Sequence, residues 1–423
     1  MKRILFVDDE VFVLDGLRRM LRRMRSKWEM DFVESGEKAL EMMADKTYDV
    51  IVSDMRMPNL SGADLLNKVK DQYPHTIRFI LSGYSDKDLI LKSLESTHQY
   101  LSKPCDPETL KTRILRATSL QDSIGIDSLQ NLVSQLGELP TLPTIHNELL
   151  KLLRIPDVSG ESLSDAIKKD IGITAKILKF ANSGYVGLKR KISSVSDAVS
   201  YLGMEYIRSI ILTIGAFGRL KEFKVDGLPL EEFWNRSLQT AEAAKAIAIS
   251  QTSSKSQAEE AYVSGLLHSA GKLILYSTFP EKVEEVEALL KSSEDYDLLK
   301  AEVEVFGASH SQVGAYLLGL WGLANSVVES VHWYSDPMNS VPVDFQPLTA
   351  VHVAFALLAD EEDPMRARCQ KGSDIFFPKV HIDEDYLDKI GLLSRLDDWR
   401  FLVSGYLNPN SNRKELVSGM LRD

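Results

Sequence analysis

The first 103 residues contain four short, mainly apolar runs, and each run ends directly before a charged or hydroxyl side chain. Runs of this length are typical of buried strands. In an open parallel sheet, the carboxyl ends of neighbouring strands meet at the edge where ligands bind. The runs and the residues after them are 4–7 before Asp8 and Asp9, 50–53 before Asp54, 77–81 before Ser82, and 100–102 before Lys103. We therefore predict an α/β fold whose sheet edge collects these side chains.

Three of the collected side chains are carboxylates. Asp8, Asp9 and Asp54 would repel one another at close range unless a cation lay among them. A hard divalent ion with oxygen ligands suits such a group, and we expect Mg²⁺. The Asp54 carboxylate would then be able to attack a phosphoryl group. Lys103 would neutralise phosphoryl oxygens, and Pro104 after it is compatible with a cis peptide bond that aims the lysine.

Acidic residues at the end of one strand are usually solvated turn residues, so Asp8 and Asp9 alone predict little. The ordered set is more specific. Residues 1–120 resemble the receiver domain of a bacterial response regulator, on these residues together with three further segments: Met57-Pro58, Gly62 and Ser82-Gly83-Tyr84. The resemblance implies a flavodoxin-like fold with a parallel five-stranded sheet. It also implies a sensor histidine kinase or a phosphotransfer protein as partner.

The same resemblance implies a separate role for each acidic residue. Asp54 would be the phosphoacceptor, Asp9 and Asp54 would bind Mg²⁺ directly, and Asp8 would act largely through water. The backbone carbonyl of Arg56 would complete the protein ligands of the ion.

Two further residues are implied to respond to phosphorylation. Ser82 would form a hydrogen bond with the phosphoryl group, and Tyr100 would change rotamer when Ser82 moves. A switch of this kind acts locally, so its effect has to reach the rest of the chain through neighbouring elements.

Composition limits the classes of partner. The net charge of −11 argues against nucleic acid as a partner. Two cysteines, Cys105 and Cys369, suit a reducing compartment. Acids interrupt the apolar start of the chain, and no apolar run approaches membrane length. We expect a cytoplasmic protein without a membrane partner.

After Lys103 the alternation of strands and helices stops, and most later segments have the helical period. We predict a receiver domain at 1–120, a helical linker at 121–138, an all-helical domain at 139–340 and a C-terminal helical extension at 341–423. Gly125 interrupts the linker at a cost of about 1 kcal/mol relative to alanine and is our candidate hinge. One helix is predicted across 258–276. We expect the two halves to pack together until Asp54 is phosphorylated.

Three of the eight histidines lie in segments that occur together in one family, although a lone histidine on an apolar helix is usually a core or surface residue. The series resembles an HDOD output domain, a relative of the metal-dependent HD phosphohydrolases. The resemblance covers about residues 128–340. Its segments are Leu139-Pro140-Thr141-Leu142-Pro143, Asn182-Ser183, 192–203, Phe233-Trp234, 265–273 with His268, and 310–332 with His310, Trp321 and His332.

The chain departs from the catalytic relatives at three positions. Arg236 stands where their first ligand histidine would be, Ser269 where the aspartate of the His-Asp pair would be, and Phe355 at the expected place of the last aspartate. Arginine stays protonated and offers no lone pair, and a neutral serine does not bridge two cations. The three histidines could hold one zinc-like ion, or they are remnants of an ancestral site. We favour remnants, so we expect no second metal.

Three functions from different classes therefore compete. The first, which we favour, is a phosphorylation-controlled protein that acts through protein-protein interaction with a downstream signalling protein. The second is a cyclic-dinucleotide phosphodiesterase like the HD-GYP relatives, although no Gly-Tyr-Pro segment lies near the site. The third is a DNA-binding regulator, which the charge balance disfavours. Formation of a homodimer is left open.

Overall fold

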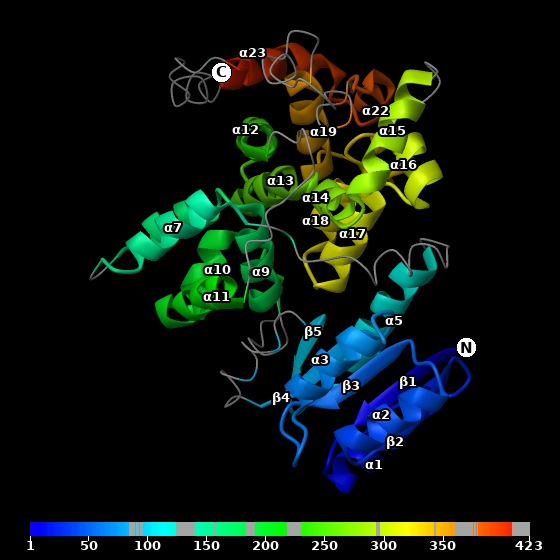
Figure 1. Ribbon diagram of the computed structural model, residues 1–423. Helices are drawn as coiled ribbons and strands as arrows, with labels where there is room; N and C mark the ends of the chain where they lie inside the picture. The colour runs from blue at the N-terminus through cyan, green and yellow to red at the C-terminus, as the bar shows by residue number, and fades with distance from the viewer. Residues whose placement is uncertain are drawn as a thin grey trace.

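The computed structural model contains two parts stacked on one another, an N-terminal α/β part and a larger helical part (Figure 1). The structure describes the chain apart from residues 84–88, 90–92, 94–95, 124–138, 140, 156–157, 183–190, 218–229, 293–296, 342–343, 360–374, 376–377, 379 and 408–423. The predicted hinge at Gly125 and most of the predicted linker lie outside the described residues.

The N-terminal part is built on one parallel sheet of five strands in the order β2-β1-β3-β4-β5. This is the flavodoxin-like order, as predicted. Its elements are β1 (Lys2–Val7), α1 (Val11–Met20), a 3₁₀ turn (Arg22–Met24), β2 (Trp28–Val33), α2 (Gly36–Asp45), β3 (Val50–Asp54), α3 (Gly62–Gln72), β4 (Ile77–Ser82), β5 (Gln99–Ser102) and α5 (Pro107–Ser123).

The central strands are continuous apolar runs because helices cover both faces of the sheet. All residues of β3 and β4 are buried, as are the last four of β1. The helices begin where the sequence offers caps: the hydroxyl of Ser35 accepts from the backbone of Lys38, and that of Ser61 accepts from Asp64. The strands therefore end in register at one edge, next to the N-terminus of α3.

The second part is all-helical among its described residues, as predicted. Its helices are α7 (Pro143–Leu152), α8 (Gly160–Ile167), α9 (Ile171–Ala181), α10 (Val195–Leu202), α11 (Met204–Phe217), α12 (Leu230–Gln251), α13 (Lys255–Leu267), α14 (Ala270–Thr278), α15 (Pro280–Ser292), α16 (Leu298–Phe306), α17 (His310–Leu320), α18 (Asn325–Trp333), α19 (Pro347–Leu358), α22 (Glu384–Lys389) and α23 (Leu396–Leu407), with 3₁₀ turns at Pro337–Asn339 and Leu393–Arg395.

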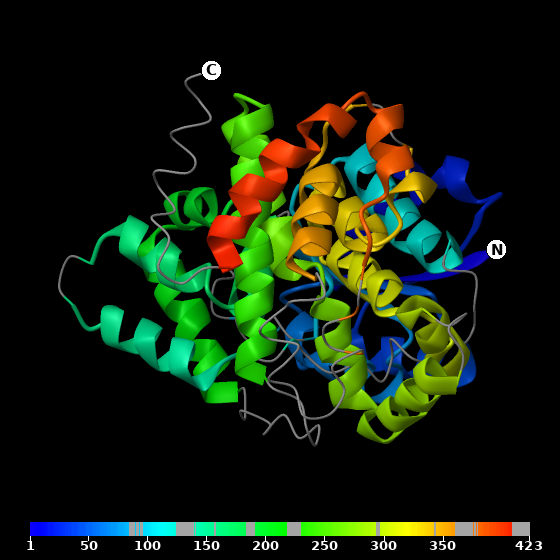
Figure 2. The ribbon, with the colours of Figure 1, turned by 90° about the horizontal axis from the view of Figure 1, so that it is seen from above.

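The last helices pack back on the helical part. In the view from above, α23 crosses over α12 (Figure 2). Trp399 of α23 is fully buried in a core that also contains Ala243 and Ile247 of α12 and Phe355 of α19. The indole nitrogen of Trp399 donates to Ser250 at 3.2 Å. The C-terminal helices thus share a hydrophobic core with the helices before them.

The single helix predicted across 258–276 is wrong, because the structure divides it into α13 and α14 at His268 and Ser269. The apolar pattern continues through this point and gives no sign of a break. The break lies next to a close contact between two helices. A Cβ atom on Gly271 would lie 1.9 Å from the backbone oxygen of His310, so α14 meets α17 backbone to backbone.

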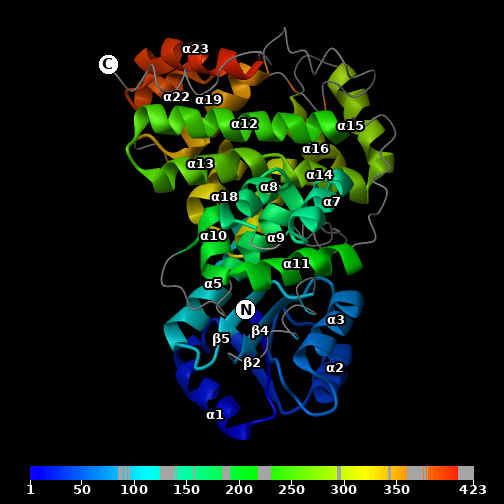
Figure 3. The same ribbon diagram turned by 90° about the vertical axis from the view of Figure 1, so that its left-hand side faces the viewer.

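The two parts contact each other through α17, which lies above β5 and α5 in Figure 1. The side-chain amide of Gln99, at the start of β5, donates to the carbonyl of Leu320 at 3.0 Å. A view from the side shows the same stacking, with α22 and α23 at the end farthest from the sheet (Figure 3). The expectation that the two halves pack together agrees with this contact.

Candidate functional site

The carboxyl edge of the sheet brings together Asp8, Asp54 and Lys103. Asp8 follows β1 and Asp54 ends β3, and the two are 1% and 7% exposed. The ammonium of Lys103 donates to Asp8 Oδ2 at 2.7 Å and also pairs with Asp54 Oδ1. The second oxygen of Asp54 accepts the backbone N–H of Arg56 at 2.7 Å. Two buried carboxylates therefore share one positive charge.

The backbone holds Lys103 in this position. Its N–H donates to the carbonyl of Ser82 at 2.8 Å, which continues the pairing of β4 with β5. The peptide bond between Lys103 and Pro104 is cis, in agreement with the sequence.

The charged groups at this edge of the sheet shift one another's pKa values. Burial raises the pKa of the Asp54 carboxyl, and Lys103 opposes that rise. Burial alone would lower the pKa of Lys103, but its hydrogen bonds to Asp54 and Asp8 outweigh it and raise that pKa. A positive charge beside Asp54 therefore favours the ionised carboxylate, which is the nucleophilic form.

The third predicted carboxylate, Asp9, does not join the other two. Its side chain is exposed. Within the described residues, no group of three or more His, Cys, Asp or Glu side chains is placed to hold a metal ion. Of the three predicted carboxylates, the structure thus joins two, Asp8 and Asp54, through Lys103. The donor set still fits Mg²⁺, since anionic oxygens already surround a cation here.

The two residues predicted to respond to phosphorylation are both buried. Ser82 is 1% exposed, and its Oγ has no hydrogen-bond partner among the described residues. Tyr100 points into the interior, where its hydroxyl lies 2.9 Å from Ser93 Oγ. A buried hydroxyl without a partner costs free energy, so Ser82 is suited to bind a further acceptor.

In the helical part, His310 belongs to a buried hydrogen-bond network that the sequence did not reveal. Its Nδ1–H and backbone N–H both donate to Glu302 Oε2, at 2.6 and 2.8 Å. Tyr276 donates to the other Glu302 oxygen at 2.5 Å. His310 Nε2 lies 2.6 Å from the hydroxyl of Tyr334, which donates to it. These four side chains, which we call the His310 network, come from α14, α16, α17 and the residue after α18.

The protonation of the His310 network is set by burial and by the carboxylate. Burial lowers the pKa of His310, so the ring is neutral. Burial would raise the pKa of Glu302, but His310 outweighs it, and the carboxylate stays ionised. The anion therefore accepts from three donors, which compensates its burial.

His268 also points toward Tyr334. Its Nδ1 lies 2.6 Å from the carbonyl of Gly265, to which it donates. The ring of His268 packs edge-on against Tyr334 and tilted against Phe355, with both centroid distances 4.9 Å. Burial lowers the pKa of His268 to about 3, so this ring is neutral too. The aromatic rings of Tyr334 and Phe355 fill the space beside the two imidazoles.

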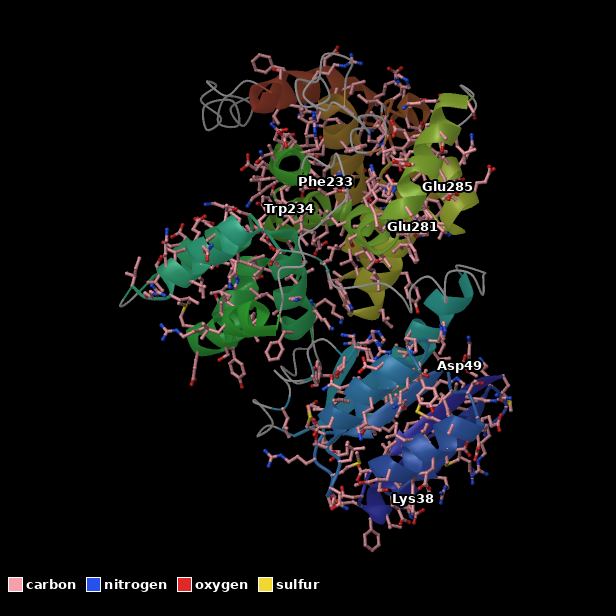
Figure 4. The ribbon with its side chains drawn as sticks, viewed as in Figure 1. Lys38, Asp49, Phe233, Trp234, Glu281 and Glu285 are labelled. Atoms are coloured by element: carbon pink, nitrogen blue, oxygen red, sulfur yellow. The ribbon has the colours of Figure 1, made fainter. Side chains whose placement is uncertain are left out.

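The remaining positions of the predicted site make contacts of another kind. Arg236 is buried, and its guanidinium donates to the carbonyl of Leu358. Ser269 Oγ lies 3.2 Å from Ser237 Oγ. Phe233 and Trp234, which precede Arg236 on α12, are buried inside the helical part (Figure 4). Arg236 therefore anchors α12 to the end of α19.

Comparison with known families decides the identity of both parts. A family model of the response regulator receiver domain matches residues 4–115, and a model of the HDOD domain matches residues 139–337. This chain is a response regulator with a receiver domain and an HDOD domain. Its output half is thus related to the HD domains.

Individual proteins are similar to this response regulator at low sequence identity. It is 25% identical to an uncharacterized protein of Treponema pallidum (strain Nichols), over 53% of this chain and 43% of the relative. It is 28% identical to a cyclic di-GMP phosphodiesterase of Thermotoga maritima, over 27% and 30% of the two chains. The solved MmoQ response regulator from Methylococcus capsulatus str. Bath is 27% identical, over 62% of this chain and 98% of that one, with a TM-score of 0.45. The chain spans less than half the length of these two curated relatives.

His332 of the HDOD domain does not join the His310 network. Its ring stacks on Trp333, with a centroid distance of 4.2 Å. Both rings line a pocket of about 440 Å³ that is open to solvent, together with Leu299 and Val303 of α16. The alternative in which three histidines hold one ion therefore receives no support at His332, which the end of α18 turns toward the surface.

None of the described helices combines the length and the apolar character needed to span a membrane.

Proposed function

We propose that phosphorylation of Asp54 by a histidine kinase or a phosphotransfer protein controls an HDOD domain that acts by binding another protein. The observation that carries the output half of this proposal is the position of Tyr334. Its hydroxyl donates a hydrogen bond to the Nε2 atom of His310, and its ring packs against the ring of His268. An aromatic side chain thus stands between the two histidines that a catalytic metal would need.

The input half rests on the pair of carboxylates around Lys103. Asp8, Asp9, Asp54 and the carbonyl of Arg56 are the groups that would hold Mg²⁺. The ion would supply charge neutralisation for an incoming phosphoryl group.

The protein's own residues do the rest of the work in phosphoryl transfer. Asp54 presents one oxygen to Lys103, while the backbone N–H of Arg56 fixes the other. Lys103 would move with the transferred group and neutralise its oxygens. The Ser82 hydroxyl would donate to one of them, which gives this buried group the partner it lacks among the described residues.

The output half lacks the means to activate water by the mechanism of HD enzymes. Arg236 is held by the carbonyl of Leu358, and Ser269 is neutral. Phe355 offers a hydrocarbon ring at the place expected for the last aspartate. We infer that His268 and His310 are structural remnants. The alternative, a metal-dependent cyclic-dinucleotide phosphodiesterase, draws its support from the similarity to the Thermotoga maritima protein, which is named a cyclic di-GMP phosphodiesterase.

We propose the division of the chain into a receiver at 1–120, a linker at 121–138, an HDOD domain at 139–340 and an extension at 341–423. The core shared by α12, α19 and α23 supports treating the HDOD domain and the extension as one folding unit. Partners would be the kinase or phosphotransfer protein at the receiver and a signalling protein at the HDOD domain, with a homodimer as a further arrangement to test.

The first test is phosphoryl acceptance. The purified protein should be labelled by acetyl phosphate in a Mg²⁺-dependent way, and Asp54→Asn should abolish labelling because the nucleophile is lost. Asp45→Asn, at the exposed end of α2, is the matched control and should label like the wild type. Labelling of Asp54→Asn at the wild-type level would show that Asp54 is not the phosphoacceptor.

The second test is hydrolysis. With Mg²⁺, Mn²⁺ or Fe²⁺ we expect no turnover of cyclic dinucleotides or nucleotide monophosphates. Turnover that disappears in His268→Ala would establish the phosphodiesterase instead. Capture of partners with and without beryllofluoride, a phosphoryl mimic, then tests whether binding depends on the receiver.

A further inference from the structure

Helix α17 is attached to the receiver at one end and to the His310 network at the other. Its last residue, Leu320, accepts the side-chain amide of Gln99 on β5. Its first residue, His310, holds Glu302 and Tyr334. The helix has eleven residues, so its ends are about 16 Å apart. One rigid element therefore spans the distance between the two domains' buried polar groups.

The receiver end of this connection is firmly built. Gln99 is 6% exposed and immediately precedes Tyr100 on β5. One turn before Leu320, the buried Tyr316 lies close enough to Arg78 of β4 to interact with its charge. The guanidinium of Arg78 is itself fixed by the carbonyls of Ser96, Pro74 and Thr76. A displacement of β5 would therefore be felt at the end of α17.

The other end of α17 is held without intervening side chains. A Cβ atom on Gly271 would lie 1.9 Å from the backbone oxygen of His310 and 2.8 Å from the nitrogen of Gly314. Helix α14, which carries Gly271, also carries Tyr276 of the His310 network. Since the two backbones touch, a shift of α17 along its axis cannot be absorbed by side-chain rotation.

Phosphorylation would act close to the receiver end. It adds roughly two negative charges beside Lys103, directly after the four-residue strand β5 that begins with Gln99. We propose that α17 transmits the phosphorylation state of Asp54 to the His310 network, through the contact of Gln99 with Leu320. This inference rests on the proposed function for its input. It adds the route by which the receiver regulates the HDOD domain.

In the unmodified protein, the Gln99 contact then holds α17 in the position in which His310, Glu302 and Tyr334 are joined. Loss of that contact frees α17 and loosens the network at its far end. Because coupling between two sites is reciprocal, weakening the contact should also change how readily the receiver takes the phosphoryl mimic.

Hydrogen exchange of the full-length protein, followed by mass spectrometry, tests this route. In the unmodified state, Gln99→Leu should raise exchange in peptides that cover 310–320 and in those that contain Glu302. Gln72→Leu, on the exposed end of α3, is the matched control and should leave both unchanged. Tyr316→Phe serves as a second variant, because it keeps the ring and removes only the hydroxyl near Arg78. Equal exchange in wild type and both interface variants would overturn the proposal.

The same exchange measurement is then repeated with beryllofluoride and Mg²⁺ bound to the receiver. The wild type should show raised exchange in α17, whereas Gln99→Leu should show a smaller further change. An α17 that does not respond, in protein shown to bind the mimic at Asp54, contradicts the route. If Asp54 is not labelled at all, the proposed input fails, and the comparison of Gln99→Leu with Gln72→Leu still decides the coupling.

Discussion

Lys272 is a buried cation that takes no part in the proposed phosphoryl chemistry. It is 1% exposed, and its ammonium donates to the carbonyl of Ile375 at 3.0 Å. Burial lowers its pKa from 10.5 to about 8, and the nearby Glu302 only partly opposes this. Because the unfolded chain exposes this lysine to water, the two states bind different numbers of protons above pH 7.

We predict that this lysine makes stability increase with pH. Between pH 8 and 10.5 the folded state binds fewer protons than the unfolded state, so the free energy of unfolding rises with pH in that window. The contribution between pH 7 and 9 is about 1 kcal/mol. Urea unfolding of wild type and Lys272→Met at both values measures it, because the difference between the two proteins isolates this group.

The exposed Lys151 on α7 provides the control for that measurement. Lys151→Met should keep the pH dependence of the wild type. A Lys272→Met protein whose stability changes with pH as the wild type does would show that Lys272 is not the titrating group.

The individual residues of the receiver could be predicted because each lies at the end of a strand or directly after it. Asp8, Asp54, Ser82 and Lys103 are placed by the ends of a parallel sheet, and the apolar runs mark those ends. The exposed position of Asp9 could not be predicted, since the sequence does not say which acid of a pair turns inward.

The His310 network was missed for a different reason. Glu302, Tyr276 and Tyr334 come from separate segments of the chain, so no local spacing links them to His310. A carboxylate on the apolar face of α16 was the one signal that could have indicated a buried partner. His332 was grouped with the other histidines by family pattern, whereas the orientation at the end of α18 sends it to the surface.

At the level of elements, the helix predicted across 258–276 is divided next to a close contact between helix backbones. The apolar period runs through 258–276, but α14 must approach α17 at Gly271. This contact depends on a segment some forty residues away along the chain. The apolar period of the helix itself carries no information about that segment. The caps at Ser35, Ser61, Ser194 and Ser309, in contrast, are local and legible in the sequence.

Gly271→Ala should therefore destabilise the HDOD domain. The added methyl group would collide with the carbonyl of His310, and overpacking of this kind costs about 1–3 kcal/mol or more because backbone has to move. Gly16→Ala is the control: it lies within α1 with nothing within 4 Å of the new Cβ, so it should stabilise by roughly 0.5–1 kcal/mol. Thermal unfolding of both variants checks the pair, and an unchanged Gly271→Ala would refute the tight packing of α14 on α17.

At the scale of the whole molecule, the receiver and the HDOD domain meet along β5, α5 and α17. The helices α22 and α23 lie at the opposite end (Figure 3). An interface that includes the neighbours of Tyr100 places the contact between domains close to the residues that would respond to phosphorylation of Asp54. The contact therefore has the position needed to respond to the receiver.

Phosphorylation should accordingly loosen or rearrange the two domains. The phosphoryl group adds negative charge beside Lys103, and the altered β5 would weaken the bond from Gln99 to Leu320. Solution scattering with beryllofluoride and Mg²⁺ should therefore give a profile different from that of the unmodified protein, with a larger radius of gyration if the domains separate. Asp54→Asn treated in the same way should keep the unmodified profile. Identical profiles, from wild type shown to have bound the mimic, would mean that phosphorylation acts without rearranging the domains.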